Sequence, residues 1–280
     1  MVGWRDGGLA AALAAQLAAM GVVGDAAAQA RPERAMRCGG EVVARASAGR
    51  VIDGRTLVLE DGREVRLAAI EVPPLAQTQQ TGGAPGGAAA KDALAALVMG
   101  AEVVLRRAEV PSDRYGRLLA YAASVRDGLE RPAQAELIAG GFARVAARVG
   151  SRDCAMELLA RERAARAAKL GLWADSYYDL LAADNPAGVL AQRDRFALVE
   201  GKVLSVRESG ATIYVNFGRR WTEDFTVTIL KRNERKFVAA GVEPKRLAGR
   251  LIRVRGWIEE RGGPWIEPAY PEQIELADRE

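Results

Sequence analysis

The stretch that most constrains this chain is residues 51–74, VIDGRTLVLEDGREVRLAAIEVPP. Alternating apolar and polar residues at 56–60 and 64–70 predict two strands, and the Asp-Gly pair between them predicts a turn. The double proline that follows ends the second strand, because proline cannot donate to a sheet ladder. Arg66 is a permanent cation in this apolar strand. A charge in such a place needs a partner, and the partner indicates what the site holds.

A second arginine has a similar position. Residues 113–121 read DRYGRLLAY, in which Arg117 follows a Tyr-Gly turn and opens another predicted strand. The side chain of Arg66 leaves its strand on the face opposite to its apolar neighbours, at the strand's end. Two guanidiniums in one cavity suit a phosphate, because each can donate two hydrogen bonds while remaining charged. We therefore expect Arg66 and Arg117 to point into one cavity, with Glu71 paired to at least one of them when no phosphate is bound.

The first part of the chain alternates predicted strands and helices. Further strands are predicted at 102–107 and 118–125, and helices at 88–99, from 132 to about 140, and at 153–170. In the last helix, Met156, Leu159 and Leu170 recur at helical spacing and predict a buried face. Its arginines are predicted to form a solvated face: Arg161, Arg163 and Arg166.

The second part of the chain is rich in predicted strands. They lie at 198–207, 211–217, 225–230, 251–259, 264–267 and 273–276, with a helix at 231–240. Three strands, a helix and then two strands is the order of an OB-fold, a small Greek-key barrel. We therefore predict two domains, 31–175 and 196–280, joined by a linker at 176–195.

Composition excludes several functional classes. Nearly half of the 280 residues are hydrophobic, so global disorder is excluded. The chain has no histidine, which excludes histidine-based triads, bases and metal ligands. The formal net charge of +4 is only a weak indication of a polyanionic partner.

The first thirty residues predict a secretory signal peptide. A basic residue precedes an Ala- and Leu-rich run, and an Ala-Gln-Ala site at 28–30 precedes Arg31. A helical or disordered extension is the alternative. We expect a periplasmic or secreted protein, cleaved near Ala30, with no membrane span in the mature chain. The two cysteines, Cys38 and Cys154, are then predicted to form a disulfide, with two buried free thiols as the alternative.

Five stretches in order resemble the staphylococcal nuclease (thermonuclease) family: VIDGRTLVL, REVRLAAIEVPP, DRYGRLLAY, LIAGGFARV and ERAARAAKLGLW. The resemblance spans residues 43–173, about half of the chain. It implies a β-rich α+β fold, in which a five-stranded OB-like barrel carries three helices. It also implies calcium-dependent cleavage of DNA and RNA. The family's two active-site arginines fall on Arg66 and Arg117, and Arg114 and Tyr115 match positions that line its nucleotide pocket.

The chain departs from that family where the metal and the general base are expected. The family's Asp-Gly-Asp-Thr is here Asp53-Gly54-Arg55-Thr56, so Arg55 replaces a calcium ligand. A second ligand, an aspartate, corresponds to Glu71, and the proposed general base corresponds to Pro74. A fixed cation repels a divalent ion, and proline cannot accept a proton. Two roles are open for Arg55: a third cation around a phosphate, or a solvent-facing turn residue.

These departures leave three functional hypotheses. The first is a nuclease-fold protein that binds nucleic acid or nucleotide phosphates and hydrolyses them weakly or not at all. The second is an active phosphodiesterase with a reorganised site, in which Asp53, Glu71 or Asp113 supplies a base or binds calcium. The third is a protein-binding scaffold of the cell envelope. Under the first, Arg66, Arg117 and Glu71 form the site, no metal or cofactor is assigned, and protein partners are not predicted.

The second domain adds a predicted nucleic-acid surface. Aromatic residues alternate with a basic cluster between Lys231 and Arg255, a combination that suits single-stranded nucleic acid on an OB-fold. Trp257 and Arg255 are the candidates from the last hairpin. The alternative is that the aromatic residues fill the barrel core, and OB-folds also bind proteins and saccharides.

Overall fold

The computed structural model describes residues 38–75, 84–220 and 222–277. The predicted signal peptide and its cleavage site lie outside the described residues, as does Trp221. Within the part that is described, no helix is long and apolar enough to cross a membrane.

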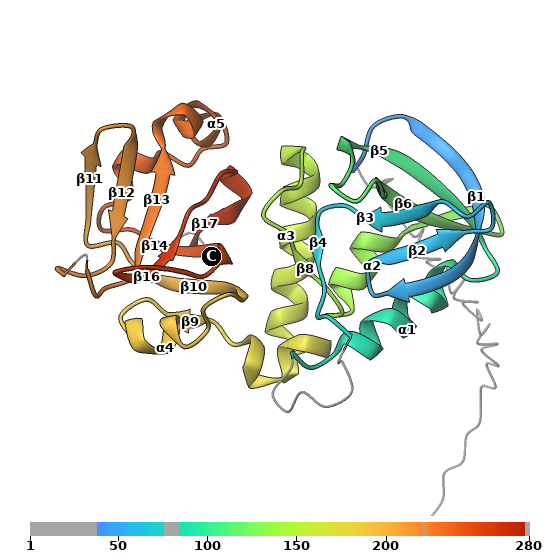
Figure 1. Ribbon diagram of the computed structural model, residues 1–280, viewed down its shortest axis with the longest axis horizontal. Coiled ribbons are helices and arrows are strands. Elements are labelled where there is room, and N and C mark those ends of the chain that lie inside the picture. Colours follow the sequence, from blue (N-terminus) through green and yellow to red (C-terminus); the bar gives the residue numbers. More distant parts are fainter. Residues whose placement is uncertain (1–37, 76–83, 221, 278–280) are drawn as a thin grey trace, which may run out of the picture. The chain divides into compact units, whose positions relative to one another are not determined.

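Five strands of the first part close into a ring (Figure 1). Their order is β3-β2-β1-β5-β6, and β3 also pairs in parallel with β6. The strands are β1 (Val42–Asp53), β2 (Thr56–Leu59), β3 (Glu64–Leu67), β5 (Glu102–Ser112) and β6 (Leu118–Arg126). The two strands predicted around the Asp-Gly turn, and the two predicted after it, are therefore present. The sequence pattern missed β7 (Leu129–Pro132), which pairs with the end of β6.

Three helices pack against this ring: α1 (Gly87–Val98), α2 (Ala133–Ala139) and α3 (Arg152–Ala167). Leu94 of α1 and Leu137 of α2 are fully buried in one cluster with Leu57, Val65 and Leu105 of the strands. A short pair, β4 (Ile70–Glu71) with β8 (Arg144–Val145), continues the chain from β3. The parallel pairing of β3 with β6 places the end of β3, and therefore Arg66, next to β6.

The prediction for the face of α3 was partly wrong. Leu159 is buried, but Met156 is 59% exposed and Leu170 lies beyond the helix, which ends at Ala167. The buried face is instead made of Cys154, Ala155, Leu158, Leu159, Glu162 and Ala165. The prediction that the arginines of this helix form a solvated face fails for Arg166, because only 16% of its side chain is exposed. Arg161, in contrast, is only partly buried and pairs with Glu157 across one helical turn.

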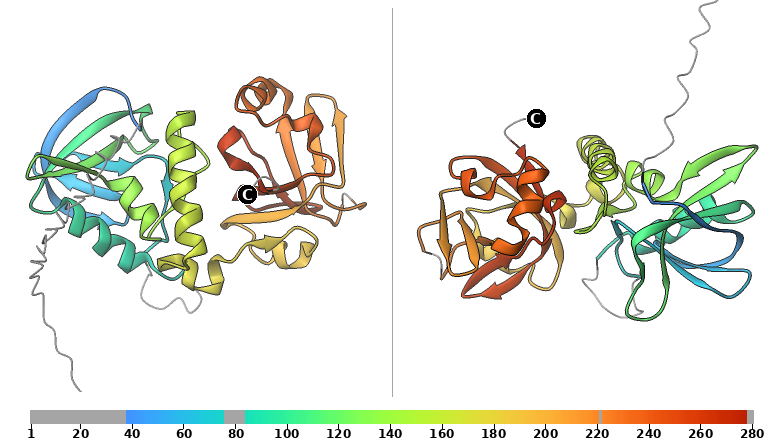
Figure 2. Two further views of the ribbon diagram at one scale, coloured as in Figure 1. Left: turned by 180° about the vertical axis from the view of Figure 1, so that it is seen from behind. Right: turned by 90° about the horizontal axis from the view of Figure 1, so that it is seen from above.

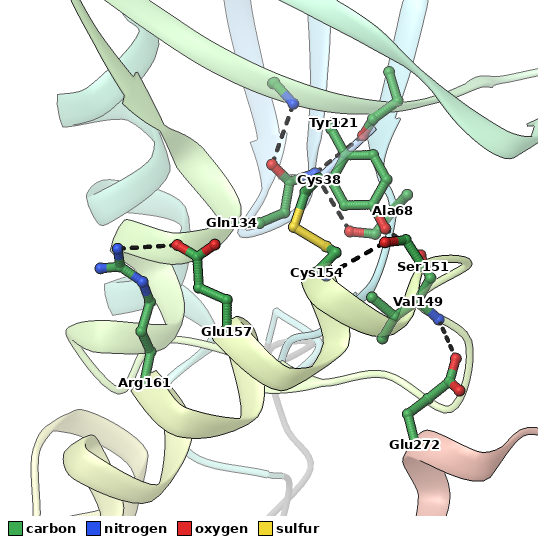
Figure 3. The surroundings of a disulfide bond; sticks show 12 residues. Cys38, Ala68, Tyr121, Gln134, Val149, Ser151, Cys154, Glu157, Arg161 and Glu272 are labelled. Carbon is green, nitrogen blue, oxygen red and sulfur yellow. Dashed lines mark hydrogen bonds and ion pairs between the residues drawn. A yellow bond between two sulfur atoms is a disulfide. The ribbon is translucent and has the colours of Figure 1, made fainter. Parts of the chain in front are cut away.

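The predicted disulfide is confirmed. Cys38 and Cys154 are bonded, with their Cα atoms 4.8 Å apart and a sequence separation of 116 residues. Figure 3 shows the bond joining the segment before β1 to the first turn of α3, beside Tyr121. The side chain of Ser151 caps that helix by accepting a hydrogen bond from the Cys154 N–H. Both cysteines lie among buried residues of the main core, so the bond ties the segment before β1 to the interior.

The last part of the chain contains two sheets. One has the order β17-β14-β10-β9, and the other has the order β11-β12-β13-β16-β15. Strands β11, β12 and β13 run side by side (Figures 1 and 2). The bounds are β10 (Phe196–Lys202), β11 (Ser205–Ser209), β12 (Thr212–Asn216), β13 (Thr226–Leu230), β14 (Leu251–Trp257), β15 (Glu259–Arg261), β16 (Gly263–Ile266) and β17 (Ile274–Leu276). The first predicted strand divides in two at Val203 and Leu204, and each half joins a different sheet.

The predicted helix after β13 is also present, as a 3-10 turn (Lys231–Asn233) followed by α5 (Glu234–Ala239). The predicted strands and helix therefore occur in the predicted sequence order, but the divided first strand and β15 add two strands to it. A core of its own, which includes Phe225, Ile229, Phe237 and Ile252, lies within this part. Buried aromatic side chains such as Phe225 and Phe237 fill the interior, as the alternative interpretation of the pattern held.

The segment predicted as a linker is structured. It contains 3-10 turn η2 (Ser176–Tyr178), β9 (Leu181–Ala182) and α4 (Pro186–Leu190), and β9 pairs in parallel with β10. A third apolar cluster joins Ala165 and Trp173 to Phe196 and Leu198. The proposed domain limits at 175 and 196 remain predictions.

Candidate phosphate-binding site

The turn between β1 and β2 positions the first residue of the site. The Asp53 carboxylate accepts a hydrogen bond from the Arg55 N–H at 2.9 Å, which closes an Asx-type turn. Gly54 lies against α1 so closely that a Cβ on it would be 2.6 Å from the Cβ of Ala90. Glycine is therefore required there, and its contact with the helix fixes the direction in which Arg55 leaves the turn.

Arg55 points at the residues that follow β3. Its Nη1 donates to the Glu71 carboxylate in a short ion pair and lies 3.4 Å from the carbonyl oxygen of Ile70. Both charged side chains are about four-fifths buried. Glu71 therefore does pair with an arginine, but the expectation that it would pair with Arg66 or Arg117 was wrong. The cation that pairs with Glu71 is Arg55, the residue for which the resemblance implied the place of a calcium ligand.

Arg66 lies beside this ion pair without a partner of its own. Within the described residues, its guanidinium has no hydrogen bond or ion pair. Burial first, and then the positive charges of Arg55 and Arg117, lower the pKa of Arg66, while Glu71 and Asp53 act in the opposite direction. A half-buried cation among other cations is a site that favours an anion.

Arg117 is held by the turn before β6. Its Nε donates to the Asp113 carboxylate at 2.7 Å, and the same carboxylate accepts from the backbone N–H groups of Tyr115 and Arg117. These bonds hold the pKa of Asp113 below its ordinary value despite the opposing effect of burial. The pairing of β3 with β6 places Arg66 opposite Leu119, two residues after Arg117. Arg117 therefore lies just before the strand that pairs with β3, close enough for its charge to lower the pKa of Arg66. It is not among the residues that line the cavity beside Arg66, so the expectation that both arginines point into one cavity is not met.

The outer edge of the site carries an exposed aromatic ring. Tyr115 is 67% exposed, and the guanidiniums of Arg114 and Arg117 lie 4.7 and 5.2 Å from its ring centroid. Such a ring, held by two cations and open to solvent, can stack on a base while the arginines contact its phosphate.

The cavity between these elements has a volume of about 300 Å³. The charged residues that line it include Arg55, Arg66, Glu71 and Asp113. Arg148, which was not among the residues predicted from the sequence, lines it as well. Arg148 donates to Glu109 at 2.9 Å and carries another guanidinium to the cavity wall. Only the fold brings it there, because nothing near it in the sequence marks it as a site residue.

Acidic residues in the described part of the chain do not form a metal centre. No group of three or more Asp, Glu or Cys side chains lies close enough there to hold a metal ion. Pro74, for which the resemblance implied the position of a general base, is exposed in the segment that follows β4. The geometry therefore offers cations and hydrogen-bond donors to an oxyanion, and it offers no oxygen cage for calcium among the described residues.

A profile of the staphylococcal nuclease homologue family matches residues 64–175. Over these residues, which make up less than half of the chain, the protein is similar to that family. The match covers the arginine-bearing strand β3, the Arg117 turn and α3, and it begins after Arg55. A comparison with curated proteins found no match to the chain.

Beyond the nuclease-homologue domain, the structure corrects one predicted nucleic-acid contact. Arg255 is 1% exposed, and its guanidinium donates to Glu162 of α3 and to Glu275 of β17. A buried, paired guanidinium cannot reach a nucleic acid, so Arg255 is a structural residue.

Trp257, the other predicted contact in this part, is 54% exposed and meets Phe196 edge to face. The basic cluster that precedes it in the sequence is partly neutralised. Lys231 and Lys245 both pair with Glu208, and Arg246 pairs with Glu243. Trp257 therefore keeps the exposure that stacking needs, whereas the cluster keeps less free charge than the sequence indicated.

Proposed function

We propose that this chain is a nuclease-fold protein that binds nucleic acid or nucleotide phosphates and hydrolyses phosphodiester bonds weakly or not at all. The observation that carries the proposal is the ion pair between Arg55 and Glu71 beside Arg66, which has no partner among the described residues. The guanidinium of Arg55 pairs with Glu71, the carboxylate that the resemblance assigns to calcium. The two arginines that the resemblance assigns to the phosphate, Arg66 and Arg117, remain. Arg66 and Arg117 are the phosphate contacts, and Glu71 holds Arg55 in place.

The electrostatics support binding without turnover. At 4 Å and an effective dielectric constant of about 20, two like unit charges repel each other by roughly 4 kcal/mol. A divalent cation at that distance from Arg55 would be repelled twice as strongly. A phosphate gains attraction from the same charge. Water activation needs a base or a metal-bound hydroxide, and Pro74 supplies neither.

Binding is tested by fluorescence anisotropy with a short single-stranded oligonucleotide. The double variant Arg66→Ala, Arg117→Ala should weaken binding by about tenfold or more, because removing one partner of a hydrogen-bonded charge pair typically costs a few kcal/mol. The log–log slope of affinity against salt should become shallower by roughly 0.7 for each phosphate that the variant no longer neutralises. Arg63→Ala is the matched control, since Arg63 is an exposed arginine in the β2–β3 turn that pairs with Asp61. Equal affinity of the double variant and the control would remove this site from the proposal.

Hydrolysis is tested on the same protein with DNA and RNA substrates, with calcium, other divalent ions or a chelator. We expect little cleavage under all conditions. Robust cleavage that the chelator abolishes would instead establish an active phosphodiesterase with a reorganised site.

We further infer that the ring β3-β2-β1-β5-β6 is the five-stranded barrel of the nuclease fold and that residues 196–280 form an OB-like domain. The element order of the second part supports this, as does its separate core. We also infer export to the periplasm or the medium, which the disulfide supports because such bonds persist in oxidising compartments. Residues near Arg31 should form the N-terminus of the mature protein, which sequencing of the exported chain tests.

A further inference from the structure

A second basic cleft lies away from the Arg66 cavity. Its volume is about 720 Å³, within the range of small-molecule sites. The end of α3, the 3-10 turn η1 (Gly171–Ala174), residues 178–180 and β14 form its walls. Four cations and one acid are among the described residues that line it: Arg163, Arg166, Lys169, Arg253 and Asp179.

Arg166 is incompletely satisfied in this cleft. Its Nη1 atom is buried and has no hydrogen-bond partner in the described part of the chain. Its ion pair is with Glu162 at 3.8 Å, beyond hydrogen-bond distance. Glu162 is already engaged, because its two oxygens accept hydrogen bonds from Arg255 and from the Val145 N–H. Arg166 therefore shares a carboxylate whose hydrogen bonds belong to other groups.

Trp173 supplies a second donor without an acceptor. The indole is 6% exposed, and its Nε1 has no hydrogen-bond partner among the described residues. The Arg166 guanidinium lies 5.5 Å from the centroid of this ring. An indole N–H can only donate, so a buried one needs an acceptor atom nearby. Arg166 and Trp173 both line the cleft, and these two donor atoms lie buried beneath its surface. Because neither has an acceptor among the described residues, the place favours a group rich in acceptor oxygens.

The charges around Arg166 also favour a bound anion. Burial, and then the positive charge of Arg253, lower the pKa of Arg166, against the opposing effect of Glu162 and Glu275. These carboxylates do not offset the combined effect of burial and neighbouring cations at this position. An added anion would relieve that repulsion and would favour the charged guanidinium.

We propose that this cleft is a second anion site, which binds the phosphate group of a small molecule between Arg166, Lys169 and the indole of Trp173. Guanidiniums recognise phosphate through paired hydrogen bonds, and a doubly charged oxyanion suits several converging cations better than a carboxylate does. The side chains of Arg166 and Arg253 are only 16% and 6% exposed. Arg253 is ion-paired with Glu200, whereas Lys169 is exposed, so the partly exposed Arg166 and Lys169 are the cations that contact the phosphate.

The test uses the full mature chain carrying Arg66→Ala and Arg117→Ala, so that the first site does not contribute. Isothermal titration calorimetry with inorganic phosphate and with a 5′-nucleoside monophosphate should each show one binding event. Arg166→Gln should weaken it by about tenfold or more, and Lys169→Gln by several-fold. Arg161→Gln is the matched control, because Arg161 lies on the same helix, pairs with Glu157 and does not line the cleft.

Each outcome decides the proposal. Equal affinity for the two ligands identifies the phosphate alone as the recognised group, and tighter binding of the nucleotide with the same sensitivity to Arg166 adds a nucleoside. The proposal is overturned if neither ligand binds at millimolar concentration, if only a single-stranded oligonucleotide binds, or if the cleft variants behave as Arg161→Gln does. Should circular dichroism show that Arg166→Gln does not fold, the variant Lys169→Gln, at an exposed position, decides in its place.

Discussion

At the scale of single residues, the proposed function depends most on Arg55. Its guanidinium reaches Glu71 and the Ile70 carbonyl, where a metal ion would need oxygen ligands. The Asx-type turn at Asp53 holds its backbone, and the ion pair with Glu71 holds its guanidinium. In the proposed function, the guanidinium of Arg55 thus fills a place where the resemblance implies a calcium ligand.

The reverse change should restore catalysis. Arg55→Asp with Pro74→Glu returns a carboxylate to the metal position and a proton acceptor to the position of the base. We expect calcium-stimulated hydrolysis of a DNA substrate to rise by at least about a hundredfold, the scale of a general base. A plasmid-nicking or fluorogenic assay with and without chelator measures it. Arg63→Asp with Pro74→Glu is the control, because it makes the same charge change at an exposed position of the β2–β3 turn. Equal activity in both double variants would show that position 55 is not the metal site.

At the scale of elements, the Gly54 turn connects the packing of α1 to the position of Arg55. A methyl group at residue 54 would meet the Cβ of Ala90 at 2.6 Å, so turn or helix must move. Gly54→Ala should destabilise the protein by about 1–3 kcal/mol and should also weaken oligonucleotide binding. Gly49→Ala in β1 is the control, since a Cβ there meets its neighbours at ordinary distances of 3.5 Å. Denaturant unfolding measures the loss of stability, and anisotropy measures the loss of affinity. If Gly54→Ala weakened binding no more than Gly49→Ala does, the packing of α1 would not control the position of Arg55.

The disulfide acts at the same scale, since it joins the entry to β1 to the start of α3. It closes a long loop, so its removal frees much entropy in the unfolded chain. Cys38→Ala with Cys154→Ala should lower the free energy of unfolding by about 4 kcal/mol. Urea unfolding with and without reductant measures the change. Reductant should destabilise the native chain by a similar amount and leave the double variant unaffected; a double variant as stable as the native chain would contradict the prediction.

At the scale of the whole molecule, a buried ion network joins α3 to the strands of the last part. Arg255 donates to Glu162 at 3.0 and 2.6 Å and to Glu275 at 2.5 Å, and all three are nearly inaccessible to solvent. Removing one partner leaves a buried charge uncompensated. Glu162→Gln should therefore lower the free energy of unfolding by about 3–5 kcal/mol. Glu157→Gln, on the same helix and more exposed, should cost about 1 kcal/mol or less. Similar losses in both variants would contradict a special role for the network.

The same network predicts a dependence on acid. Burial alone would raise the pKa of Glu275, but Arg255 and then Arg253 hold it below the ordinary value of 4.5. A carboxyl group with a lowered folded-state pKa contributes stability above its unfolded pKa, and the contribution is lost as the pH falls through the folded value. Stability should therefore decline below about pH 4.5. Glu275→Gln should show a smaller decline in thermal unfolding over that range, and an unchanged decline would exclude this carboxylate as the cause.

Local sequence pattern was sufficient to predict the order and type of most elements. The alternation around the Asp-Gly turn predicted β2 and β3, and the pattern after residue 196 predicted the strands and α5 of the second part. These predictions succeed because strand periodicity and turn residues are local properties of the chain. The disulfide also followed from simple reasoning about cysteine number and a signal-like N-terminus, and the pairing is confirmed.

Long-range packing determined which charges meet. Glu71 pairs with Arg55 rather than with Arg66, Arg148 enters the first cavity, and Arg255 is buried against Glu162, which lies 93 residues earlier in the chain. An arginine has the same local signal whether it faces a phosphate, solvent or a buried carboxylate. Its role depends on the partners that the fold brings within hydrogen-bond distance, and no local pattern carries that information.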